Sequence, residues 1–82
     1  MLSPSQCRAA RGLIGHTQAQ LAKRAGIGLS RLRNFETGRL AVPAEIVAKI
    51  CAALEAAGVQ FIAENGGGEG VRLKAPNRRR GR

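Results

Sequence analysis

The 82-residue sequence predicts one small, mainly α-helical domain that ends in a β-hairpin. Three observations lead to this fold class. Apolar residues recur every three or four positions in four stretches of residues 3–57, and a glycine follows each stretch. After Gly58 the apolar period changes to two, which is typical of strands. We therefore expect a compact bundle of four or five helices, with two short strands after it.

Capping residues mark the first two predicted helices. Ser3 is a suitable N-cap and Pro4 suits the first helical position, while Gly15 is expected to end this helix. The run Thr17-Gln18-Ala19-Gln20 fits a capping box, in which a Thr and a Gln three positions later bond each other's backbone. Gly26 is expected to end the second helix in the left-handed conformation, which costs glycine no steric energy.

The third and fourth predicted helices carry most of the large apolar residues. The third is expected over residues 28–37, with Gly38 as its stop. The fourth is expected to start at Pro43 and to have Gly58 as its C-cap. The residues that these two helices are expected to bury are Leu32, Phe35, Ile46, Ile50 and Leu54.

The stretch VQFIAENGGGEGVRLK predicts two strands around a glycine-rich turn. Two strands alone are marginally stable in water, and a strand with free backbone groups tends to pair with another chain. We therefore expect the hairpin to form the interface of a homodimer, with the fourth helix as the alternative. The residues expected at this interface are Val59, Phe61, Val71 and Leu73.

These boundaries divide the chain into three parts. We expect a DNA-binding unit over residues 1–57, a dimerising β-hairpin over 58–75 and a disordered basic tail over 76–82. The tail would raise the affinity for phosphate through its arginines. These arginines are Arg78, Arg79, Arg80 and Arg82.

The positive charge is concentrated in two blocks. The formal net charge is +9, and residues 1–40 hold seven basic side chains and one acidic side chain. Residues 41–70 hold one basic and four acidic side chains, whereas residues 71–82 hold six basic side chains and no acidic one. Two basic blocks around an acidic middle favour one surface for an anionic partner such as nucleic acid.

Other classes of protein find little support in the sequence. No apolar run is long enough to span a membrane, and the first residues have no apolar core of a signal peptide. Cys7 and Cys51 are expected to be reduced thiols on inner helix faces of a cytoplasmic protein. Together with His16 they lack the spacing of a metal site, and no catalytic set is recognisable, so we expect neither a metal, nor a cofactor, nor an enzyme.

The stretch TQAQLAKRAGIGLSRLRNFETG, residues 17–38, has small and large residues where two crossing helices require them. Ala22 is small where the next helix must pass, Gly26 supplies the turn, and Leu21, Leu32 and Phe35 fill the space between the helices. This pattern indicates a helix-turn-helix arrangement, whose second helix lies in the DNA major groove. A helical hairpin without such a role is the alternative interpretation.

On these residues the sequence resembles the xenobiotic-response-element (Cro/cI-type) helix-turn-helix family, over about residues 3–57, as a small single-domain bacterial member. The resemblance implies a lambda-repressor-like bundle of four or five helices that binds operator DNA. It also implies that Gln18 contacts phosphate and braces the third helix, and that Arg39 meets the DNA backbone. A structural pair of Arg11 with Glu36 is implied as well. The residues implied to face the groove are Leu29, Ser30, Arg31, Arg33 and Asn34.

Two functions from different classes are consistent with these features. The first is a sequence-specific transcriptional regulator, a repressor that binds a palindromic operator as a homodimer on the nucleoid. The alternative is an antitoxin or anti-activator, which would hold a regulatory protein through the acidic middle of the chain and the apolar strands.

Overall fold

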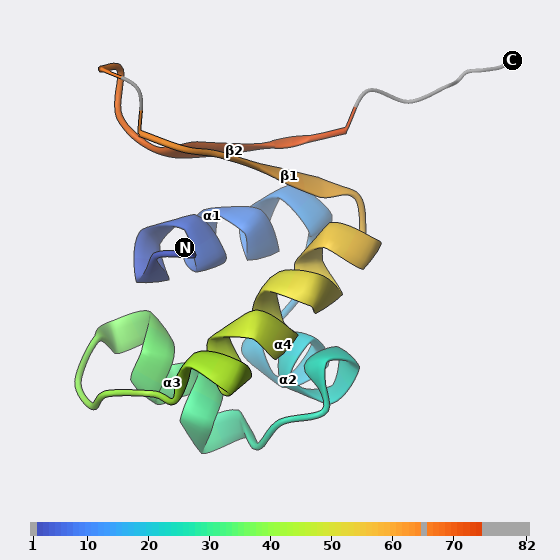
Figure 1. The fold of residues 1–82 in the computed structure, drawn as a ribbon. Helices are drawn as coiled ribbons and strands as arrows, with labels where there is room; N and C mark the ends of the chain where they lie inside the picture. Colours follow the sequence, from blue (N-terminus) through green and yellow to red (C-terminus); the bar gives the residue numbers. More distant parts are fainter. Residues whose placement is uncertain (1, 65, 75–82) are drawn as a thin grey trace, which may run out of the picture.

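The chain folds into four helices followed by a two-stranded antiparallel hairpin (Figure 1). The computed structural model describes residues 2–64 and 66–74. This confirms the predicted fold class, and the predicted tail over 76–82 lies outside the described residues. The helices and strands are α1 (Pro4–Ile14), α2 (Gln18–Ala25), α3 (Leu29–Thr37), α4 (Ala44–Ala56), β1 (Val59–Ile62) and β2 (Gly70–Leu73).

Capping boxes open both α1 and α2. The Thr17 side chain accepts a bond from the backbone N–H of Gln20, and the Gln20 side chain accepts one from Thr17 in return. This confirms the capping box predicted for α2. The same exchange joins Ser3 and Gln6 at the start of α1, where the sequence predicts only the N-cap. Each exchange satisfies two backbone donors that a helix leaves free at its start.

Glycines in the left-handed conformation end α1, α2 and α3, with φ of 69° at Gly15, 72° at Gly26 and 68° at Gly38. The fourth helix ends differently. Its C-cap is Ala57, with φ of −84°, so the prediction of Gly58 as the cap is wrong by one residue. Gly58 follows with φ of 101° and turns the chain into β1.

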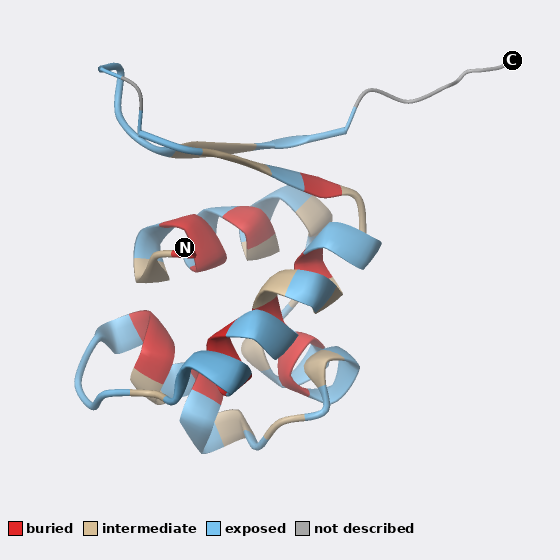
Figure 2. Cartoon of the chain, in the orientation of Figure 1, coloured by how far each residue is buried: buried red, intermediate tan, exposed pale blue. Residues whose placement is uncertain are grey.

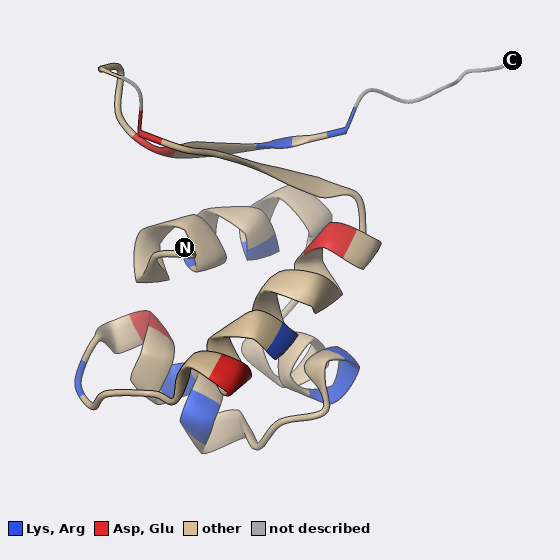
Figure 3. Ribbon diagram, viewed as in Figure 1, with Lys and Arg blue, Asp and Glu red and all other residues tan. Residues whose placement is uncertain are grey.

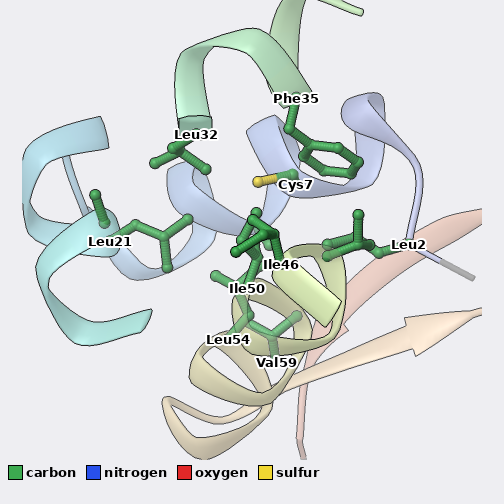
Figure 4. Packing of buried hydrophobic residues seen from close by; sticks show 12 residues of the cluster. Leu2, Cys7, Leu21, Leu32, Phe35, Ile46, Ile50, Leu54 and Val59 are labelled. Carbon is green, nitrogen blue, oxygen red and sulfur yellow. The ribbon is translucent and has the colours of Figure 1, made fainter. Parts of the chain in front are cut away.

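One hydrophobic core joins all four helices to the first strand (Figures 2 and 4). Leu21 of α2, Leu32 of α3, Ile50 and Leu54 of α4 and Val59 of β1 are fully buried. Each such side chain stabilises the fold by about 1.5–3 kcal/mol relative to an exposed one. The helices and the first strand therefore depend on each other for stability.

The hairpin lies along α1, on the side opposite to α3 (Figure 1). Its register pairs Val59 with Leu73 and Phe61 with Val71. Val59 is fully buried in the core of its own chain, so, contrary to the expectation from the sequence, its side chain has no surface to offer to a dimer. Phe61 and Val71 also pack against this core, whereas Leu73 is 49% exposed.

Polar side chains of α1 hold the hairpin in place. The Gln6 side-chain amide donates to the backbone oxygens of Ile62 (3.3 Å) and Gly70 (3.1 Å). The Ser3 hydroxyl donates to the carboxylate of Glu69. Gln6 is 5% exposed, so both of its bonds lie largely out of reach of water.

The two cysteines differ in how far they are buried. Cys7 is fully buried on the inner face of α1, as predicted, whereas Cys51 of α4 is only partly buried. Both are free thiols in the described part of the chain.

Candidate nucleic-acid interface

A three-residue turn joins α2 to α3. The N–H of Gly26 bonds the carbonyl oxygens of Ala22 and Lys23, and the N–H of Ile27 bonds the Ala22 oxygen at 3.0 Å. Gly28 then takes an extended conformation and opens α3 without a side-chain cap bond. Ala22 is 3% exposed in the core that α3 covers, so a small residue is needed at this crossing.

The outer face of α3 presents a row of polar side chains. Ser30, Arg33, Asn34 and Thr37 are three or four positions apart, so they lie on one face of the helix. They line a hollow of about 360 Å³, together with Gln18 from the start of α2 and Arg39 from the loop after α3. Five of the seven residues predicted to contact DNA therefore meet at one place.

The other two predicted contacts lie elsewhere. Leu29 is half-buried and packs against the core, and it does not line this hollow. Arg31 is exposed and lines a second hollow of about 230 Å³, which shares Asn34 with the first and also includes Leu40 and Pro43. Helical geometry explains the difference, because successive positions point about 100° apart around the helix axis.

Thr37 lines the hollow but is not among the residues predicted from the sequence. Its hydroxyl donates to the backbone oxygen of Arg33 at 2.9 Å and accepts from the N–H of Arg39 at 3.3 Å. Thr37 therefore fixes the start of the loop that carries Arg39. The available signal was its position seven residues after Ser30, which places both on the same helix face.

A buried carboxylate ties α3 to the two helices before it. Glu36 is 2% exposed, and Arg11 of α1 donates to both of its oxygens, at 2.7 and 2.9 Å. Gln18 of α2 donates to Oε1 at 2.9 Å, and Cys7 of α1 donates to Oε2 at 3.2 Å. Arg8 also donates to the backbone oxygen of Glu36. The orientation of α3 is therefore set by hydrogen bonds as well as by packing.

This network shifts the pKa values of three of its members, and the hydrogen bond to Glu36 raises that of Arg11. Burial alone would raise the pKa of Glu36, but the hydrogen bonds from Arg11, Gln18 and Cys7 outweigh it and lower that pKa. Burial raises the pKa of the Cys7 thiol well above its ordinary range, and the hydrogen bond to Glu36 and its charge act in the same direction. Cys7 is therefore a neutral donor in this network and not a reactive thiolate.

Gln18 belongs to both the network and the hollow. Its amide nitrogen donates to Glu36, and its side chain also lines the hollow beside Arg33 and Arg39. The buried charge pair thus sits directly behind the polar surface. The family resemblance implied the pair of Arg11 with Glu36 but not the bond from Cys7, which lies four positions before Arg11 on the same helix face.

The charges of the described residues are unevenly distributed (Figure 3). Exposed Lys and Arg lie on α2, on α3 and on the loop after α3, and others lie on α1, α4 and β2, whereas the turn between the strands carries the acidic Glu64 and Glu69. The hollow is lined by two of these arginines, Arg33 and Arg39, and by no acidic residue. The four predicted tail arginines, over 78–82, lie outside the described residues.

A model of the helix-turn-helix domain family matches residues 6–61, which include most of α1, all of α2 to α4 and most of β1. The chain belongs to this family. Helix-turn-helix domains bind DNA, so the chain is a DNA-binding regulator of a typically non-enzymatic family. No curated protein matches the chain. Among the residues that the structure describes, every helix is too short or too polar to cross a bilayer.

Proposed function

We propose that the chain is a Cro/cI-type repressor that binds a palindromic operator as a homodimer, in the cytoplasm and associated with the nucleoid. The observation that carries this proposal is the hollow in which Gln18, the outer face of α3 and Arg39 meet. A helix that offers polar side chains along one face, beside the start of the preceding helix, has the form that the major groove accepts.

Within this surface the side chains would divide between bases and phosphates. Arg33 and Asn34 can each form paired hydrogen bonds, Arg33 with guanine and Asn34 with adenine, and each good pair gives about 1–3 kcal/mol of discrimination. Gln18 and Arg39 flank the hollow and would contact phosphates, which determine position and affinity but not sequence. Ser30 and Thr37 would complete this surface with hydroxyl groups.

The proposal of a homodimer follows from the small size of α3. Its nine residues give a length of about 13 Å, which spans only about four base pairs. So short a site recurs throughout a genome. Two copies related by a two-fold axis would double the number of base pairs contacted and would require a palindromic site.

The test is a selection of bound fragments from a random duplex library, made with the wild type and with two variants. Wild-type protein should enrich a two-fold symmetric sequence. Arg33→Ala should lose about 5- to 150-fold of its preference for that sequence. Arg24→Ala is the matched control, because Arg24 is exposed in the last turn of α2 and outside the hollow, so preference should be kept.

The two outcomes that would count against the proposal differ in meaning. An Arg33→Ala variant that keeps the wild-type preference would remove α3 as the element that contacts bases. A wild type that enriches no sequence at all would favour the alternative, an antitoxin or anti-activator that acts through protein contact.

A further inference from the structure

The hairpin leaves a strand edge with free backbone groups. The N–H of Lys74 donates to the Gly58 oxygen at 2.8 Å, and the register continues with Gln60 opposite Arg72. Hydrogen-bonded and non-hydrogen-bonded pairs alternate along an antiparallel ladder. Val71 and Leu73 are therefore non-hydrogen-bonded positions, and their N–H and C=O groups point away from β1.

The two edges of the hairpin differ in what lies beside them. Along β1, Val59 is fully buried, and a hollow next to Phe61 and Cys51 carries the carboxylate of Glu55. The β1 edge therefore lies next to α4, which packs against this strand. The hollow beside β2 includes Glu69, but Glu69 precedes the strand, and the edge at Val71 and Leu73 is left for another strand.

The space beside β2 suits an incoming strand. A hollow of about 150 Å³ beside Gly70 and Val71 is lined on the α1 side by the small residues Ser5 and Ala9. Leu73, at the end of the same edge, is 49% exposed, although it is one of the few large apolar side chains left at the surface of the described chain. Pairing along β2 would cover this leucine and fill the hollow.

The positions of the charges favour one direction of pairing. Glu69 precedes β2, and its side chain bonds Ser3 on the α1 side, whereas Arg72 lies on the other face of the strand, where it bonds Gln60. Parallel pairing in register with a second copy would place each of these charges beside its own copy. Antiparallel pairing about Val71 keeps the two Glu69 side chains apart and the two Arg72 side chains apart.

We propose that β2 pairs antiparallel with β2 of a second copy, forming a four-stranded sheet, with Val71 at the two-fold axis. In this register Arg72 lies opposite Gly70 of the other copy and not opposite another Arg72, since like charges directly opposite each other destabilise a sheet. Arg72 is also held toward β1 by a 3.1 Å hydrogen bond to Gln60. This inference rests on the proposed dimeric regulator and names the surface through which it forms.

The symmetry of this dimer agrees with binding to one duplex. Antiparallel pairing of two equal strands places the two-fold axis perpendicular to the sheet. In each copy α3 lies on the far side of α1 from the hairpin (Figure 1). Rotation about this axis therefore keeps both α3 helices on the same side of the four-stranded sheet, where one DNA molecule can contact both.

The first experiment needs no substitution. Amide hydrogen exchange of the wild type is followed by NMR at protein concentrations from low micromolar to millimolar, without DNA. The N–H groups of Val71 and Leu73 should become protected at least about tenfold as the concentration rises. The N–H of Arg72, already paired with Gln60, should change much less. Exchange at Val71 and Leu73 that does not depend on concentration would overturn the proposal.

The second experiment compares two exposed leucines. Leu73→Asp should raise the dissociation constant of the dimer at least about tenfold in sedimentation equilibrium, and circular dichroism should show unchanged helicity. Leu40→Asp is the matched control, because Leu40 is 60% exposed in the loop after α3 and should leave the dimer intact. A Leu73→Asp variant that associates as well as wild type would overturn the proposal.

The same measurement separates this inference from the proposed function. Arg33→Ala should lose sequence preference and remain a dimer, because Arg33 lies on α3 and far from β2. A dimeric wild type with no sequence preference would contradict the proposed function alone. A wild type that selects a DNA sequence but stays monomeric, both free and on that sequence, would overturn this inference and the homodimer in the proposed function, but would leave sequence-specific DNA binding intact.

Discussion

Replacing Arg11 by alanine would leave the carboxylate of Glu36 buried without its charged partner. The variant loses the bonds of 2.7 and 2.9 Å, and only Gln18 and Cys7 remain as donors to the side chain. Water cannot easily replace the guanidinium, because Glu36 is 2% exposed. Breaking one side of a buried ion pair costs about 3–5 kcal/mol. An 82-residue domain has a free energy of unfolding of about 4–12 kcal/mol, so the loss would be a large share of it.

Replacing Glu36 by alanine should lower the free energy of unfolding less than replacing Arg11 does. In Glu36→Ala the guanidinium of Arg11 stays partly in contact with water, because its side chain is 20% exposed. It also keeps its hydrogen bond of 3.2 Å to the backbone oxygen of His16. We expect a loss of about 1.5–3 kcal/mol, which is typical of a hydrogen bond to a charged group.

Urea denaturation followed by circular dichroism would measure both values and their coupling. The double variant should be about as stable as Glu36→Ala alone, because Arg11 has no buried charge left to neutralise. Arg24→Ala, at an exposed position of α2, is the control and should change the free energy of unfolding by less than about 0.5 kcal/mol. A coupling energy below about 0.5 kcal/mol would refute the reasoning, because it is the value of an exposed pair.

Two further predictions concern acid and the basic tail. Because the pKa of Glu36 is lowered in the folded state, the unfolded chain binds the proton first, and stability should fall as the pH drops from about 5 through the lowered pKa. Urea titrations at several pH values should show this loss in the wild type, and an equal loss in Glu36→Gln would contradict it. Truncation after Pro76 removes four arginines, so the slope of log affinity against log salt should become shallower by up to about 0.9 for each phosphate that the tail neutralises. Sequence preference should be kept, and its loss with an unchanged slope would place the tail in a groove instead.

The helix boundaries could be predicted because their signals are local. Thr17 with Gln20 and the glycines at positions 15, 26 and 38 act through bonds to residues three or four positions away. The end of α4 was missed by one residue because Ala57 takes an ordinary turn conformation, which almost any residue can adopt.

The division of α3 into inner and outer faces could be predicted only in part. Leu32 and Phe35 are plainly apolar, but Leu29 lies at the first position of the helix, where facing in or out depends on how α3 crosses the core. Arg31 and Arg33 are two positions apart, about 200° around the helix axis, so they line different hollows. The family resemblance implied Arg11 as the partner of Glu36 and a bracing role for Gln18, but not the bond from Cys7, which meets Glu36 only after α1 and α3 have packed together.

The packing of the hairpin residues could also be predicted only in part. The alternation of apolar and polar residues identified one face of two strands, and the register of the strands places its members together. These residues are Val59, Phe61, Val71 and Leu73. The alternation did not indicate that this face would be covered mainly by the chain's own helices. That outcome depends on Gln6 of α1 and on its N-cap Ser3, whose bonds to the hairpin join residues 56 to 66 positions apart.

The bonds between α1 and β2 also affect the order in which the parts of the protein can fold during synthesis. Ribosomes add about 5–20 residues per second, and contacts between distant residues form more slowly than local ones. The caps of α1 and α2 can form early, but Gln6 must wait for Gly70, and the core must wait for Val59. A nascent chain that has exposed α2 and α3 therefore still lacks part of the packing that holds them. The packing behind the polar face of α3 is complete only after Val59 has joined the core.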